Sequence, residues 1–348
     1  MIKDWFVRAL PAILLCSVGA VLPAEQDTLS VAAVQFEVDE ATYRSPRRLE
    51  RRVSALVKEA TNAGADLVVF PEYINVFLLV DEYAGAIERS DTAEEALERI
   101  VAARGAGREK AGSPHEAGDS VNALRRILEN QADETEERII ELWGRIARRE
   151  EVYIVAGTYF APTGPAAGTP TGTPTGPPTE AGAAADGDVA LANRALVFDP
   201  RGNIAHVQDK SFLTPFEKRR VALVGSDPRN IDTFEVNGFD VAVTICRDSF
   251  FDEWESRFRD ADLWIELRAN GERYTKEVRE RFEGALAERV AATPVTKGIS
   301  AGLTGSFLDF FWEGPAYVVD GEGARVDSSE DARGTDIVFT SVQKSASP

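Results

Sequence analysis

The feature that most constrains the fold is a strand, a helix and a second strand that follow one another near the start of the chain. Residues 29–36 (LSVAAVQF) are almost wholly apolar and are typical of a buried strand. Apolar residues at helical spacing follow Ser45-Pro46, a pair typical of a helix start, and Gly64 ends this helix. Residues 66–70 (DLVVF) form the second apolar run. This order predicts an α/β protein.

Later segments extend the pattern along the chain. Apolar runs predict further strands at residues 152–159, 195–199, 239–245, 263–267, 299–303, 316–320 and 337–342, and residues 274–292 predict an amphipathic helix. Residues 84–150 are charged and mostly helical in pattern, and we interpret them as a helical insertion. Residues 161–188 are dominated by Gly, Pro, Thr and Ala, which predicts a flexible loop between two hairpin strands. We therefore expect a single domain over residues 25–348.

The first residues differ from the rest in composition. Residues 1–24 combine a weakly basic start, a short apolar run and small residues at the end, which is typical of a secretory signal peptide. The apolar run is short for a membrane span. We expect a secreted or periplasmic protein without a stable membrane span after cleavage, or a membrane-anchored one if the segment stays uncleaved.

The charge balance and the missing motifs exclude several classes of function. The chain has 39 Lys and Arg against 58 Asp and Glu, a formal net charge of −19, which disfavours nucleic acid and anionic membranes as partners. His115 and His206 lie far apart without companion cysteines, so no zinc spacing is present. Gly-rich phosphate-binding loops are absent as well. We expect neither a metal nor a cofactor.

The two cysteines direct attention to one position. Cys16 lies in the predicted signal peptide, so Cys246 is the only cysteine of the expected mature chain. A single thiol is unusual in an exported protein and is a liability unless it is buried or needed. Cys246 directly follows the apolar run 239–245, and ligand sites in α/β sheets gather outside the carboxyl ends of strands. The thiol is therefore a candidate nucleophile.

Two further residues supply the help that a thiol needs. Glu72 follows the strand at residues 66–70 through a proline, and Lys210 lies in the segment DKSFLTPFEK. Taken singly, such residues are more often surface charges, and a strand-end cysteine is more often a buried small residue. A thiol becomes a nucleophile with a base or a nearby cation, and a carboxylate and an ammonium supply both. The combination therefore favours a cysteine nucleophile.

Six segments in the same order resemble the nitrilase superfamily of carbon–nitrogen hydrolases. They are VAAVQ (31–35), FPEY (70–73), NRALVFDPRGNI (193–204), KSFLTPFE (210–217), ICRDSFFDEW (245–254) and GPAYVVDGEG (314–323). The resemblance extends over about residues 29–342. It implies an α/β fold in the form of a four-layer α-β-β-α sandwich with mixed sheets, and a homodimer or higher homo-oligomer.

The resemblance also implies a role for each candidate residue. Glu72 would be the general base, and Cys246 would attack the substrate carbon and form a thioester. Lys210 would stabilise the tetrahedral intermediate, together with the backbone N–H of Arg247. Glu217 matches a second glutamate that helps many relatives to position substrate or water. No cofactor is implied.

The reaction is less well defined than the site. The Cys-Arg-Asp run at residues 246–248 resembles amidase-like branches, so we expect hydrolysis of a small-molecule amide or carbamoyl amide that releases ammonia or an amine. A nitrile substrate, a thioester-based N-acyltransferase and a catalytically silent binding or scaffold protein stay open. The long stretch between Glu72 and Val152 and the missing proline after Cys246 depart from the family pattern and leave the substrate class undetermined.

The substrate-binding residues are unknown at this point. Aromatic side chains line either a pocket or the core and a dimer interface, and the sequence does not choose between these two interpretations. The candidates are Phe250, Phe251, Trp254, Phe310 and Trp312.

Overall fold

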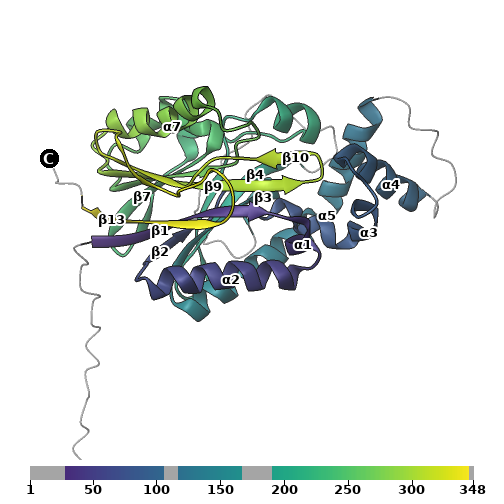
Figure 1. Ribbon diagram of the computed structural model, residues 1–348, viewed down its shortest axis with the longest axis horizontal. Coiled ribbons are helices and arrows are strands. Elements are labelled where there is room, and N and C mark those ends of the chain that lie inside the picture. The colour runs from purple at the N-terminus through teal and green to yellow at the C-terminus, as the bar shows by residue number, and fades with distance from the viewer. Residues whose placement is uncertain (1–27, 106–116, 167–189, 345–348) are drawn as a thin grey trace, which may run out of the picture.

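The computed structural model describes residues 28–105, 117–166 and 190–344 (Figure 1). The predicted signal peptide at residues 1–24 lies outside the described residues, and so does most of the predicted flexible loop at residues 161–188. No helix in the described ranges is long and apolar enough to cross a membrane.

The described strands form one hydrogen-bonded network that folds into two layers. The first layer has the order β5-β4-β3-β2-β1-β13 and the second is built on the order β9-β8-β7-β6. The first contains β1 (Thr28–Val38), β2 (Leu67–Val69), β3 (Tyr153–Pro162), β4 (Leu191–Phe198), β5 (Ile204–Asp209) and β13 (Asp336–Gln343). The second contains β6 (Phe234–Val236), β7 (Phe239–Ile245), β8 (Leu263–Arg268), β9 (Lys297–Phe307), β10 (Phe310–Trp312), β11 (Tyr317–Asp320) and β12 (Arg325–Ser328).

The two layers are joined and contain both kinds of strand pairing. The end of β1 pairs in parallel with β9 between Gln35↔Gly302 and Val38↔Gly305, which connects the layers at one end. Parallel pairs link β1 to β2, β2 to β3, β7 to β8 and β8 to β9. Antiparallel pairs link β3 to β4 and β4 to β5, among others. The hairpin partnership predicted across the low-complexity stretch is confirmed by the β3–β4 pair.

The side chains of each strand alternate between two apolar cores, one between the two sheets and one between a sheet and its covering helices. Successive residues of a strand point to opposite faces. In β1, Val31 and Ala33 belong to a cluster that also contains Val243 of β7 and Ile265 of β8, so this cluster fills the space between the sheets. The alternate residue Val34 belongs to a second cluster shared with α2 and α5. Both faces of these strands are therefore buried, which explains their almost continuous apolar sequences.

Helices cover the outer face of each sheet (Figure 1). The helices α2 (Pro46–Asn62) and α5 (Ala117–Glu150) pack on the first sheet, and α6 (Glu253–Arg257) and α7 (Lys276–Ala291) pack on the second. In α2 the buried residues are Leu49, Val53, Leu56, Val57 and Ala60, the apolar positions seen in the sequence. The order helix, sheet, sheet, helix confirms the predicted four-layer sandwich.

Shorter helical elements surround this framework. They are α1 (Glu40–Tyr43), η1 (Val76–Tyr83), α3 (Ala84–Ile87), α4 (Ala93–Gly105), η3 (Glu217–Val221), η4 (Pro228–Asn230) and η5 (Cys246–Phe250). The second half of α5 is part of the outer layer, since Trp143 packs on Phe70 with 4.7 Å between ring centroids and donates a hydrogen bond to Asn75 Oδ1 at 2.9 Å. The division of residues 25–348 into a domain with an insertion stays a prediction.

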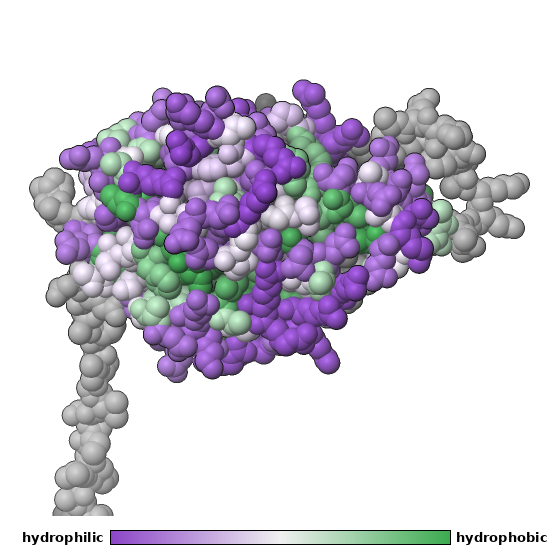
Figure 2. All heavy atoms as spheres, in the orientation of Figure 1, coloured by the Kyte–Doolittle hydropathy of each residue, from purple (hydrophilic) through white to green (hydrophobic). Residues whose placement is uncertain are grey.

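The surface is mainly hydrophilic, in keeping with the composition. Figure 2 shows hydrophilic residues over most of one face, with apolar residues gathered in smaller areas, one of them near β1 and β2. Large apolar side chains that are exposed in the described ranges include Phe216, Phe250, Val326 and Phe339. The predicted homo-oligomer stays a prediction.

Gly157 of β3 lies against the chain that follows β2, the segment that contains Glu72. It has φ +68°, and a Cβ atom there would lie 2.2 Å from the carbonyl oxygen of Pro71 and 2.4 Å from Ile74 Cγ2. The β3–β4 register shifts at the same place, between Val155 and Thr158. The absence of a side chain at Gly157 therefore lets the chain that follows β2 approach β3.

We expect Gly157→Ala to lower the free energy of unfolding by about 2 kcal/mol or more, because it adds both a strained backbone and a clash with main-chain atoms. Urea denaturation of the variant and the wild type measures this difference. Gly284→Ala is the matched control, since Gly284 lies in α7 with no heavy atom within 4 Å of the added carbon. It is expected to be neutral or to stabilise by up to about 1 kcal/mol. Equal losses in the two variants would contradict this interpretation of Gly157.

Candidate active site

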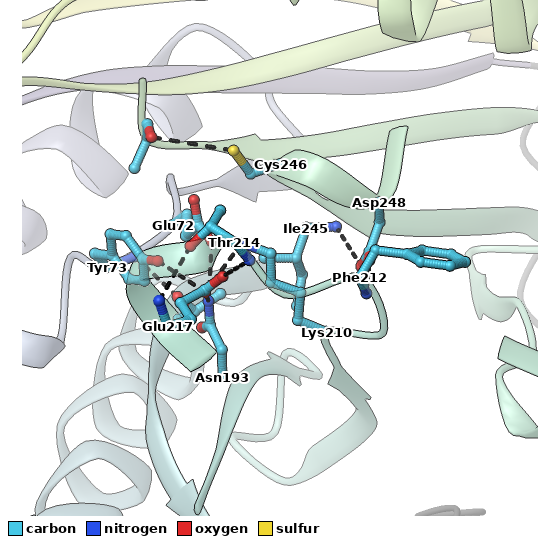
Figure 3. Close-up of polar contacts among 12 residues, drawn as sticks. Glu72, Tyr73, Asn193, Lys210, Phe212, Thr214, Glu217, Ile245, Cys246 and Asp248 are labelled. Carbon is cyan, nitrogen blue, oxygen red and sulfur yellow. Dashed lines mark hydrogen bonds and ion pairs between the residues drawn. The ribbon is translucent and has the colours of Figure 1, made fainter. Parts of the chain in front are cut away.

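The three residues singled out in the sequence lie at the ends of three strands that come from both sheets. Glu72 follows β2, Lys210 follows β5 and Cys246 follows β7. All three are buried, with exposed fractions of 1% for Glu72, 0% for Lys210 and 5% for Cys246. The structure brings them together, and Glu217 joins them from the helical turn η3 (Figure 3). The two carboxylates, the ammonium of Lys210 and the thiol of Cys246 are therefore buried together at these strand ends.

Cys246 sits on a sharp turn from strand to helix. Its φ of +50° is in the left-handed region that residues with a side chain rarely occupy. Strain of this kind persists only where the surroundings hold it, and the carboxylate of Asp248 does so. It accepts hydrogen bonds from the backbone N–H of Ile245 at 3.3 Å and of Phe212 at 2.7 Å. The same side chain therefore fastens the cysteine turn to the segment that carries Lys210.

Lys210 contacts both glutamates. Its Nζ lies 2.7 Å from Glu72 Oε1 and 3.0 Å from Glu217 Oε1. Asn193 of β4 donates from one nitrogen, Nδ2, to the same two oxygens at 2.9 and 2.8 Å. Two carboxylate oxygens therefore share two donors, one charged and one neutral (Figure 3).

The two carboxylates differ in how many donors they receive. Glu217 also accepts hydrogen bonds from the hydroxyl of Tyr73 at 2.7 Å and from the backbone N–H of Thr214, which reaches Oε2 at 2.7 Å. Glu72 Oε2, in contrast, is buried and has no hydrogen-bond partner among the described residues. An unpartnered buried carboxylate oxygen is costly, so its presence points to a group or a proton that it is there to receive.

This asymmetry separates the pKa values of the two groups. Burial raises the pKa of Glu72 to about 7, with Lys210 lowering it and Glu217 raising it. Burial also acts to raise the pKa of Glu217, but Lys210, Thr214 and Tyr73 hold it below its ordinary value. A proton that enters the pair therefore goes to Glu72, while Glu217 stays ionised.

The thiol of Cys246 and the ammonium of Lys210 both hold their protons at neutral pH. Burial and the nearby charge of Glu72 raise the pKa of Cys246 well above its usual range, although Lys210 partly offsets them. Burial acts to lower the pKa of Lys210, but Glu72 and Glu217 outweigh it and raise the value. Cys246 Sγ lies 4.0 Å from the carbonyl oxygen of Ala269. The resting thiol therefore keeps its proton and needs a base.

Arg247 offers a backbone donor next to the thiol. It is the second residue of η5, and the N–H groups at the start of a helix have no acceptor within that helix. Its side chain is exposed and lies over the ring of Phe251, with 5.6 Å from Cζ to the ring centroid. The position fits the backbone role that the resemblance implied.

Several residues of the site were not predicted from the sequence. Asn193, Tyr73, Thr214 and Asp248 all lie in the segments that carried the resemblance, but no role was assigned to them. A signal was present for Asn193, because it and Arg194 interrupt the otherwise apolar strand β4, in which every residue is buried. An amide in such a strand requires a polar partner.

The aromatic candidates divide between the core and the surface. Trp254 is fully buried in the cluster outside the second sheet, where its Nε1 donates to the carbonyl oxygen of Asp248 at 2.8 Å. Trp312 belongs to the core cluster of the first sheet. Phe251 stacks on Phe212 with 3.7 Å between ring centroids, and Phe250 is 38% exposed. Within the described residues no group of His, Cys, Asp and Glu side chains is arranged to hold a metal ion.

Comparison with known proteins shows the family and the fold. A family model described as carbon-nitrogen hydrolase matches residues 30–257. A carbon-nitrogen hydrolase from Helicobacter pylori G27 is similar in structure, with a TM-score of 0.58, 14% sequence identity, and 90% of this chain and 89% of that chain covered. An amidase from Nesterenkonia sp. has a TM-score of 0.56 and 14% identity, with 92% of each chain covered.

A mutant of the amidase from Nesterenkonia sp. AN1, in which the acetamide moiety of fluoroacetamide is covalently added at the active-site cysteine, has a TM-score of 0.55 and 14% identity, with 93% of each chain covered. No curated protein sequence matches the chain. At this level of identity the structural likeness establishes the fold, and the family model extends over more than half of the sequence. The chain belongs to the carbon–nitrogen hydrolase family.

Proposed function

We propose that the protein hydrolyses a small-molecule amide through a thioester on Cys246. The observation that carries this proposal is the buried pair of Glu72 and Lys210, 2.7 Å apart, beside a protonated thiol on a strained turn. A buried carboxylate with a pKa of about 7 accepts a proton at neutral pH and returns it in the next step. The cluster therefore supplies a nucleophile, a base and a cation at one place.

In the first half of the reaction Cys246 Sγ bonds to the carbonyl carbon while its proton passes to Glu72. The carbonyl oxygen becomes an oxyanion, which Lys210 Nζ and the backbone N–H of Arg247 stabilise. The carbon–nitrogen bond breaks as Glu72 gives the proton to the nitrogen, which leaves as ammonia or an amine. The thioester remains on Cys246.

In the second half a water molecule attacks the thioester carbon and Glu72 takes one of its protons. The carbon–sulfur bond breaks, the carboxylic acid leaves, and the proton returns to Sγ of Cys246. Glu217 stays ionised throughout, and its charge keeps Lys210 protonated. The two glutamates therefore have separate roles, with Glu72 moving protons and Glu217 fixing the ammonium.

The solved relatives favour an amide over other substrates. In a glutamate-to-glutamine mutant of the amidase from Nesterenkonia sp. AN1 the active-site cysteine forms covalent adducts with acrylamide and with the acetamide moiety of fluoroacetamide. Both reagents are small primary amides. The shared fold and the cysteine at the end of β7 support the same substrate class for this chain, without defining its acyl group.

We expect Cys246→Ala to reduce ammonia release from a panel of aliphatic, aromatic and carbamoyl amides by at least about a thousandfold, because no other described group can form the thioester. Ammonia is measured on folded protein, with the fold checked by circular dichroism. Cys16→Ala changes the chain's other cysteine and is expected to keep full activity. Amide hydrolysis that survives in Cys246→Ala would rule out the thioester route.

The pH dependence tests the assignment of the base. Glu72 has to be ionised to accept the thiol proton, so kcat/KM is expected to fall as the pH drops below about 7. Glu217→Gln removes the negative charge that raises the pKa of Glu72, so the acid limb is expected to move to lower pH. The exposed Glu137→Gln serves as the control and leaves the limb unchanged. A limb that moves to higher pH in Glu217→Gln would contradict the assignment.

A further inference from the structure

We propose that Asn193 is a positioning residue that holds the carboxylates of Glu72 and Glu217 on one neutral donor and so fixes the pH range in which Glu72 accepts the Cys246 proton. The inference rests on the proposed function, because it concerns the base of that reaction. No hydrogen bond among the described residues joins Asn193 to the thiol of Cys246, so Asn193 acts through Glu72.

The geometry of Asn193 matches a bridge between two acids. Its Nδ2 lies 2.9 Å from Glu72 Oε1 and 2.8 Å from Glu217 Oε1, and an amide nitrogen has two N–H groups, one for each oxygen. The backbone of the same residue accepts the N–H of Lys210 at 2.9 Å. A single fully buried residue of β4 therefore sets the positions of both carboxylates and of the lysine main chain.

The orientation of the amide is determined by its neighbours. Turning the side chain over would place Oδ1 against two carboxylate oxygens, which would repel it. In the observed orientation Oδ1 is buried and has no hydrogen-bond partner among the described residues. Leaving a buried acceptor unpaired costs about 1–3 kcal/mol. A packing role alone does not require this cost, whereas a bridge between two carboxylates does.

The neutrality of the donor matters as much as its position. The two glutamates and Lys210 form a cluster of two acids and one base, in which one carboxylate can hold a proton. A second cation in place of Asn193 would favour the ionised form of both acids, and Glu72 would then release protons too readily to carry them. An amide stabilises the carboxylates by hydrogen bonds without adding charge. Glu72 therefore keeps an intermediate affinity for the proton.

The remaining titratable groups around Glu72 do not duplicate this role. Lys210, Glu217, Cys246 and Tyr73 face the cluster, and Glu266 acts on Cys246 from β8. Burial also raises the pKa of Asp248 to about 7, but its carboxylate is bonded to the backbone N–H groups of Ser211, Phe212 and Ile245. Since Oε1 of Glu72 accepts from Lys210 and Asn193, the loss of Asn193 removes the neutral one of these two donors.

The test follows the pH dependence of Cys246 alkylation, which needs no knowledge of the substrate. Full-length wild type, Asn193→Leu, Asn193→Ala and Asn193→Asp are treated with iodoacetamide across a pH series that brackets neutrality, and the Cys246 peptide is quantified by mass spectrometry. Asn193→Asp is the closest isostere and keeps the packing if the apolar variant does not fold. Asn62→Leu, at the exposed end of α2, is the matched control.

We expect the acid-side midpoint of alkylation to rise by about half a pH unit or more in the Asn193 variants, because the ionised form of Glu72 loses a donor. The largest rise is expected in Asn193→Asp, and none in Asn62→Leu. Folded Asn193 variants with an unchanged or lowered midpoint would overturn the inference while leaving the proposed function intact. A wild-type Cys246 without an acid-side midpoint near neutrality would instead overturn the base assigned to the reaction, and the inference with it.

Discussion

The structure around the site depends on a buried ammonium shared between two carboxylates. Charges removed from water are costly, and the cost is recovered only where geometry and hydrogen bonds are nearly complete. Lys210 lies within 3.0 Å of both acids, and Asn193, Tyr73 and Thr214 complete the shell around them. These donors come from β2, β4 and β5 of the first sheet and from the loop after β5, so the cluster forms only when that sheet is in place, and β7 of the second sheet adds Cys246. The complete site therefore needs both sheets.

The arrangement divides two chemically identical side chains into different tasks. Glu217 accepts hydrogen bonds from four donors, whereas Glu72 accepts two on Oε1 and has the thiol of Cys246 beside it. Differences of this kind between neighbouring acids are how proteins obtain both a stable anion and a proton carrier at the same pH. The local geometry thus supports the proposed role of Glu72 as the base without reference to a substrate.

The strands and the fold class could be predicted from the sequence because β1, β7 and β8 are buried on both faces and read as continuous apolar runs. The segment of β5 was not predicted from its residues, since His206, Gln208 and Asp209 make it polar although it is buried. The positions of Glu72, Lys210, Glu217 and Cys246 followed from the order of the motifs. The bridge made by Asn193 did not, because its partners lie 121 and 24 residues away in sequence and meet only in three dimensions.

The burial of Cys246 has a second consequence, for the chemical lifetime of the protein. Oxidants such as peroxide attack the thiolate form and need access to the sulfur. A thiol that is 5% exposed and whose pKa lies well above the usual range offers neither. In the proposed reaction the sulfur becomes nucleophilic when its proton passes to Glu72. The enclosure that makes the cysteine dependent on its own base thereby also guards it against irreversible oxidation between turnovers.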